Sequence, residues 1–74
     1  MSQIEVDARG LDCPMPLLKA KQALNRMNRG QQLLLRCTDP GSRRDFEVFA
    51  RQSGHLLLSS QQQGDEFRFV LEKV

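Results

Sequence analysis

The chain has 74 residues, of which 27% are charged and 39% hydrophobic; this predicts a single folded domain, residues 1–74, rather than a disordered or fibrous chain. The formal net charge is only +2, and direct nucleic-acid binding is not expected because affinity for phosphate backbones depends on clustered Lys and Arg. No apolar run approaches ~18 residues and no signal-peptide pattern precedes Ile4, so we expect no membrane association and a cytoplasmic location.

The first expected element is a strand at residues 4–8, where apolar and acidic residues alternate. A cysteine follows in the segment Cys13-Pro14-Met15-Pro16. If Cys13 is the N-cap of a helix, Pro14 and Pro16 occupy positions N1 and N3, whose N–H groups have no partner within the helix. The other N–H groups and the helix dipole would stabilise a thiolate or persulfide anion and lower the pKa of the thiol.

Two other interpretations of this segment stay open. The regular helix begins only at Pro16, because a proline disfavours the α conformation of the residue before it. Alternatively, the segment is a strand-to-helix turn that needs prolines and contains a cysteine by chance.

After Pro16 the apolar spacing becomes helical, which predicts a helix to about Asn28 with Gly30 as the C′ residue. A second strand is expected at residues 33–38, with Cys37 on its inward face as a core cysteine. The two cysteines match neither a zinc pattern nor a disulfide framework, so free thiols are expected.

The segment Asp39-Pro40-Gly41 ends the second strand, and Asp39 is interpreted as a turn-forming residue. Ser42 and Asp45 resemble a capping box, in which Asp45 would cap the second helix. The remaining expected elements are a helix that stops at Gly54, a strand that begins near His55, a turn at Gly64-Asp65 and a strand at residues 67–72.

The resulting order βαβαββ defines an α/β fold with both helices on one face of the sheet. Two strand-helix-strand units imply parallel pairing through right-handed crossovers, and the last strand is expected to pair antiparallel. The loops after the first and second strands then emerge at the same edge, so Cys13 and residues 39–45 become neighbours. His55 falls at the opposite edge and is rejected as a base for Cys13.

Three segments resemble the TusA/SirA-like sulfur-carrier family: Gly10-Leu11-Asp12-Cys13-Pro14-Met15-Pro16-Leu17-Leu18, Thr38-Asp39-Pro40-Gly41-Ser42-Arg43-Arg44-Asp45 and Gly54-His55. The resemblance covers nearly the whole chain, and its most specific part is the Cys-Pro-x-Pro element between a strand and a helix. It implies a two-layer α+β sandwich with a mixed four-stranded sheet.

The resemblance also implies that Cys13 receives sulfane sulfur as a persulfide and hands it to an acceptor protein. The donor would be a cysteine desulfurase or a rhodanese-like protein. The acceptor would serve tRNA thiolation, molybdenum-cofactor enzyme maturation or general sulfur trafficking. Such transfer needs no metal and no bound cofactor, and it makes the chain a persulfide carrier rather than a multiple-turnover sulfurtransferase enzyme on its own.

Other residues are expected to assist Cys13. Arg43 and Arg44 either neutralise acidic partners, or steady the persulfide, or are solvated loop charges. The supporting residues are Pro14, Pro16 and Asp12, and the candidate partner-binding residues are Arg43, Arg44, Asp39, Asp45, Lys19 and Lys21.

Two other classes of protein are alternatives to a carrier. A regulatory or RNA-contacting module would use the small α/β sandwich as a docking surface and would tolerate Cys13→Ser, whereas a carrier would not. A thiol-disulfide oxidoreductase is disfavoured, because no second cysteine follows Cys13 in a Cys-x-x-Cys arrangement.

Overall fold

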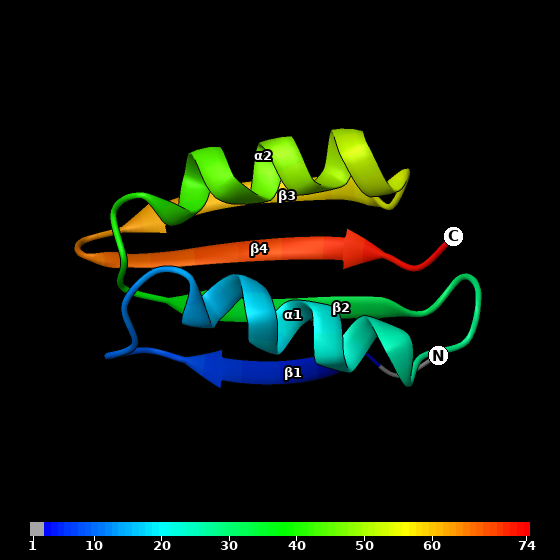
Figure 1. The fold of residues 1–74 in the computed structure, drawn as a ribbon. Helices are drawn as coiled ribbons and strands as arrows, with labels where there is room; N and C mark the ends of the chain where they lie inside the picture. The colour runs from blue at the N-terminus through cyan, green and yellow to red at the C-terminus, as the bar shows by residue number, and fades with distance from the viewer. Residues whose placement is uncertain (1–2) are drawn as a thin grey trace.

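The computed structural model describes residues 3–74, and its elements follow the expected order. All four strands belong to one sheet, and both helices lie on the same face of it (Figure 1). The α+β fold with a mixed sheet is therefore confirmed. The elements are β1 (Gln3–Ala8), α1 (Met15–Asn25), β2 (Gln32–Cys37), α2 (Ser42–Ser53), β3 (Leu56–Gln63) and β4 (Glu66–Glu72).

The strands are arranged in the order β1-β2-β4-β3. β1 and β2 are parallel, whereas β4 is antiparallel to both of its neighbours, β2 and β3. Parallel pairing is thus confirmed for the first strand-helix-strand unit. In the second unit the expectation is wrong, because β4 returns from β3 through the turn at Gly64-Asp65 and inserts between β2 and β3.

The hydrophobic core lies between the sheet and the two helices. Alternation along the strands places Leu33, Leu35 and Cys37 inward, which confirms Cys37 as a core cysteine. The rings of Phe46 and Phe69 stack with centroids 4.7 Å apart and join α2 to β4. The buried apolar residues are Ala8, Ala20, Leu24, Met27, Leu33, Leu35, Cys37, Phe46, Phe67, Phe69 and Leu71.

Helix α1 ends earlier than the sequence predicts. Its last residue is Asn25 and its C-cap is Arg26, so the expected end near Asn28 is wrong. Gly30 adopts a positive φ of 89°, but it lies in the connection to β2, where its N–H donates to the Lys73 carbonyl at 2.8 Å. Gly30 therefore forms a tertiary hydrogen bond and does not end the helix.

Helix α2 ends as expected. Gly54 is its C-cap, with a φ of 84° and its N–H donated to the Ala50 carbonyl at 3.0 Å. Within residues 3–74, none of the helices has the length and apolar character needed to cross a membrane.

Candidate functional site

The loops that follow β1 and β2 meet at one edge of the sheet (Figure 1). The Gly10 N–H donates to Thr38 Oγ1 at 2.9 Å and ties the two loops together. Potential ligand atoms of Cys13, Asp39 and Asp45 all lie within 4.8 Å of one another. The expectation that Cys13 neighbours residues 39–45 is therefore confirmed. One thiol with two carboxylates is not the Cys and His donor set of structural zinc sites, and we assign no metal to it.

Cys13 is an exposed free thiol in the turn before α1. The N-cap of α1 is Pro14 rather than Cys13, so Pro16 lies at N2 and the expected register is wrong by one residue. Asp12 supports this turn through its carbonyl, which accepts the Met15 N–H at 2.8 Å. The turn places Cys13 outside the first helical turn and presents its side chain to solvent.

The two prolines have different surroundings. Pro14 is exposed, whereas Pro16 is fully buried beneath the first turn of α1. Pro16 therefore packs against the core as well as shaping the start of the helix.

Asp45 contacts the sulfur of Cys13. The Cys13 thiol donates a hydrogen bond to Asp45 Oδ2, with a distance of 3.3 Å from sulfur to oxygen. Asp45 lies in the first turn of α2, but the N-cap there is Gly41 and no side chain caps the helix. The expected capping box of Ser42 and Asp45 is therefore wrong, and the Asp45 carboxylate lies against the thiol instead.

This contact raises the pKa of Cys13 above its usual value. The largest cause is the hydrogen bond to Asp45, which only the protonated thiol can donate, and desolvation and the negative charges of Asp45 and Asp39 act in the same direction. The positive end of α1 would favour a thiolate, but the sulfur bonds the carboxylate. The expected lowering of the thiol pKa is therefore wrong for the unloaded protein.

Asp39 shapes the loop beside Cys13. Its Oδ1 accepts the Gly41 N–H at 3.3 Å, as expected of a turn-forming residue, while its buried Oδ2 has no hydrogen-bond partner among residues 3–74. Ser42 Oγ donates to the Asp39 carbonyl at 2.6 Å and accepts the Cys37 thiol at 3.1 Å. Ser42, which the sequence suggested only as a cap, thus fastens this loop to the core.

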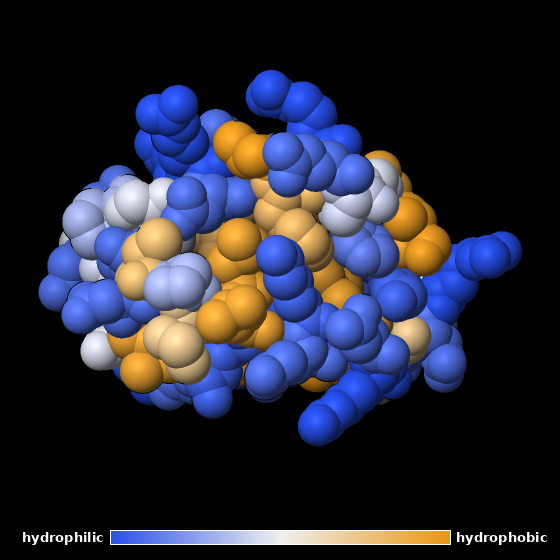
Figure 2. Space-filling model, viewed as in Figure 1, coloured by the Kyte–Doolittle hydropathy of each residue, from blue (hydrophilic) through white to orange (hydrophobic). Residues whose placement is uncertain are grey.

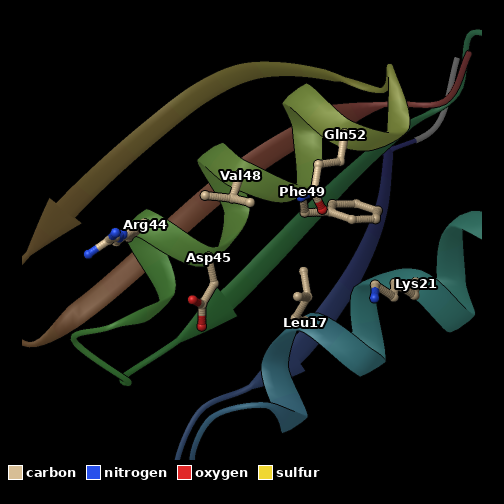
Figure 3. A pocket seen from close by; sticks show the side chains of 7 residues that line it. All are labelled: Leu17, Lys21, Arg44, Asp45, Val48, Phe49 and Gln52. Carbon is tan, nitrogen blue, oxygen red and sulfur yellow. The ribbon is translucent and has the colours of Figure 1, made fainter.

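The candidate partner-binding cations are divided between two places. Lys21 and Arg44 line a cavity of about 170 Å³ between α1 and α2, whereas Lys19 and Arg43 are exposed outside it. The cavity lining also includes Leu17, Asp45, Val48, Phe49 and Gln52 (Figure 3). Apolar surface gathers in the middle of this helix-covered face, with hydrophilic side chains around it (Figure 2). We call this cavity the inter-helix groove.

His55 lies away from Cys13, as the topology predicts. Its Nδ1 accepts the Val74 N–H at 3.2 Å, next to the C-terminal end of α2. Burial and the nearby charge of Lys73 lower the pKa of its imidazole. This contact confirms its place at the other edge of the sheet.

Comparisons with known proteins agree with this geometry. The structure superposes on the crystal structure of a SirA-like protein from Desulfitobacterium hafniense with a TM-score of 0.83, and the match covers 95% of this chain and 96% of that one. The two share 22% identity, so this similarity establishes the fold: a SirA-like α+β sandwich.

Sequence comparison defines the family. The family model for sulfurtransferase TusA matches residues 4–73. The chain is 49% identical over 69 residues to the sulfur carrier protein TusA of Allochromatium vinosum, covering 93% of this chain and 91% of that protein. It is 43% identical to a putative sulfur carrier protein of Neisseria meningitidis, covering 97% of both. The chain belongs to the TusA family.

Proposed function

We propose that this chain is a sulfur carrier, in which Cys13 accepts sulfane sulfur as a persulfide and passes it to an acceptor protein. One observation supports this above the others: Cys13 is an exposed free thiol at the edge where the loops after β1 and β2 meet. Its relatives in the TusA family bear the name sulfur carrier. The other cysteine, Cys37, is fully buried and offers no access to a donor.

The chemistry is an exchange of sulfur between two thiols. The Cys13 thiolate attacks the terminal sulfur of a donor persulfide, the donor S–S bond breaks, and a new S–S bond forms on Cys13. The donor leaves as a thiolate and takes up the proton that Cys13 lost, so that Cys–SH + R–S–SH gives Cys–S–SH + R–SH. The oxidation level of the pair does not change, and the transfer therefore needs no redox cofactor.

The donor we propose is a cysteine desulfurase or a rhodanese-like protein, and its docking surface includes the inter-helix groove. The groove is continuous with the reactive site, because Asp45 lines the groove (Figure 3) and also accepts a hydrogen bond from Cys13. Its apolar wall fits an apolar side chain of the donor, and Lys21 and Arg44 complement acidic groups beside it.

Downstream, the proposed acceptor is a protein of tRNA thiolation, of molybdenum-cofactor enzyme maturation or of a related sulfur pathway. The proposed compartment is the cytoplasm, since both Cys13 and Cys37 are free thiols and the cytosol keeps thiols reduced.

The test is the intact mass of the full chain after incubation with a cysteine desulfurase and cysteine. A carrier gains the mass of one sulfur atom, loses it on treatment with a reductant, and gains nothing as Cys13→Ser. A protein that acquires no sulfur on Cys13, and whose cellular role survives Cys13→Ser, would instead be a regulatory or RNA-contacting module.

A further inference from the structure

The sulfur of Cys13 is surrounded by negative charge. Asp45 of α2 accepts its hydrogen bond at 3.3 Å, and a carboxylate oxygen of Asp39, from the loop after β2, lies within 4.8 Å. These two aspartates are the charged groups that act on the thiol. Among residues 3–74, neither aspartate forms an ion pair with a lysine or an arginine of the chain.

We propose that Asp45 is a positioning residue that holds the sulfur of unloaded Cys13 against α2 as a protonated thiol. Cys13 then accepts sulfur only after this hydrogen bond is broken. The inference rests on the proposed carrier function and describes how the same site is controlled.

The fold fixes the backbone of Asp45 beside the sulfur of Cys13. Asp45 is half-buried in the first turn of α2, where its N–H donates to the Gly41 carbonyl at 3.3 Å. The next residue, Phe46, is fully buried against Phe69. The backbone of Asp45 therefore belongs to a helix that is packed against the core, and a thiolate formed at Cys13 would face the negative charge of the Asp45 carboxylate at short range.

This arrangement has a chemical consequence. The nucleophile in sulfur exchange and the species most open to oxidation is the thiolate. Asp45 disfavours that form, and desolvation and Asp39 add to its effect on the pKa of Cys13. The unloaded carrier is thereby protected from unproductive oxidation, while a donor must displace Asp45 from the sulfur before transfer.

The same contact would suit the opposite role, in which Asp45 acts as a general base that removes the thiol proton. The two roles differ in the effect of Asp45→Asn, which preserves the shape of the side chain and removes its charge. If Asp45 acts as a base, the variant reacts more slowly at pH values below the thiol pKa, where Cys13 must still lose its proton. Without a residue that retains the proton, Cys13 reacts faster near neutral pH, and its pH profile moves to lower pH.

The experiment measures the rate of Cys13 alkylation by iodoacetamide against pH, in the full chain and in three variants. Asp45→Asn should move the midpoint of the rate-against-pH curve to lower pH. Since only the thiolate reacts, a midpoint that falls by one pH unit raises the alkylation rate at pH 7 about tenfold. Asp45→Glu keeps a carboxylate on the same helical turn and should retain a high midpoint. Asp39→Asn is the matched control, because Asp39 places a charge near the sulfur but forms no hydrogen bond with it. This variant should move the midpoint of the pH profile less than Asp45→Asn does. Thermal melting confirms that each variant is folded.

A second measurement separates this proposal from the carrier function. A small-molecule persulfide is offered at pH 7, and loading of Cys13 is followed by intact mass. The Asp45→Asn variant should load faster than the parent. A midpoint that Asp45→Asn leaves unchanged or raises, or loading rates equal to those of the parent, would overturn the proposal. Failure of every variant to load would refute the carrier function alone, because the alkylation profile would still report how Asp45 acts on the thiol.

Discussion

Cys13 and Cys37 should differ in native reactivity toward a thiol reagent by about three orders of magnitude or more. Cys13 is exposed, whereas Cys37 is 0% exposed on β2, a strand paired on both sides by β1 and β4. A reagent therefore reaches Cys37 only when the sheet opens. For a domain of this length the free energy of unfolding is roughly 4–11 kcal/mol, so about one molecule in a thousand, or fewer, is open at a time.

The assay combines sulfur loading and alkylation with mass spectrometry of Cys13→Ser and Cys37→Ser. Cys37→Ser is a conservative control, because a serine hydroxyl keeps the hydrogen-bond donor that Ser42 Oγ accepts from the Cys37 thiol at 3.1 Å. Under native conditions Cys37→Ser should load and alkylate like the parent, and Cys13→Ser should do neither. In denaturant the remaining cysteine of each variant should react fully.

Sulfur that loads onto folded Cys13→Ser and is absent from folded Cys37→Ser would refute this reasoning. Equal alkylation rates of the two cysteines in the native parent would show that the sheet opens far more often than its pairing indicates.

Three further outcomes test charge, packing and pH. Replacing Arg43 and Arg44 by Glu should slow transfer from an acidic donor and weaken its salt dependence; transfer rates that do not change at low or high salt would make both residues solvated bystanders. Pro16→Ala should lower the free energy of unfolding by about 1.6 kcal/mol, at ~0.8 kcal/mol per lost buried carbon, and reduce Tm by roughly 6–13 °C, while exposed Pro14→Ala changes Tm little. Hydrogen bonds from two arginines lower the pKa of Glu66 from 4.5 to about 2. The contribution of Glu66 to the free energy of unfolding is therefore complete above pH 4.5 and is lost as the pH falls toward 2. Glu66→Gln should remove that part of the acid denaturation curve, and an unchanged curve would contradict the assignment.

Much of the fold could be predicted from the sequence because its signals are local. Alternation of apolar residues identified the inward face of β2, with Leu33, Leu35 and Cys37, and Gly54 marked the end of α2. The place of β4 could not be predicted in this way. A tight turn fixes only that β4 pairs with β3, whereas its pairing with β2 depends on long-range packing of the sheet.

The sequence predicted where the candidate site lies, but it did not predict the charged group that contacts the Cys13 thiol. Parallel pairing of β1 and β2 suffices to bring Cys13 near residues 39–45. The hydrogen bond between Cys13 and Asp45 joins residues 32 positions apart, and no local pattern reports it. The sequence instead offered a capping box for Asp45, and this local explanation was wrong because Gly41 is the N-cap of α2.

Opposing effects on Cys13 explain why the Cys-Pro-x-Pro motif alone does not define its reactivity. The motif places the cysteine before a helix, a position that favours a thiolate. The tertiary fold places Asp45 of α2 against the same sulfur, and this carboxylate favours the protonated form. The hydrogen bond to Asp45 is the largest cause of the raised pKa of Cys13, whereas the first turn of α1 begins two residues further along the chain. The first turn of α2 is therefore as much a part of the sulfur site as the motif, and the reactivity of Cys13 depends on how the two helices meet.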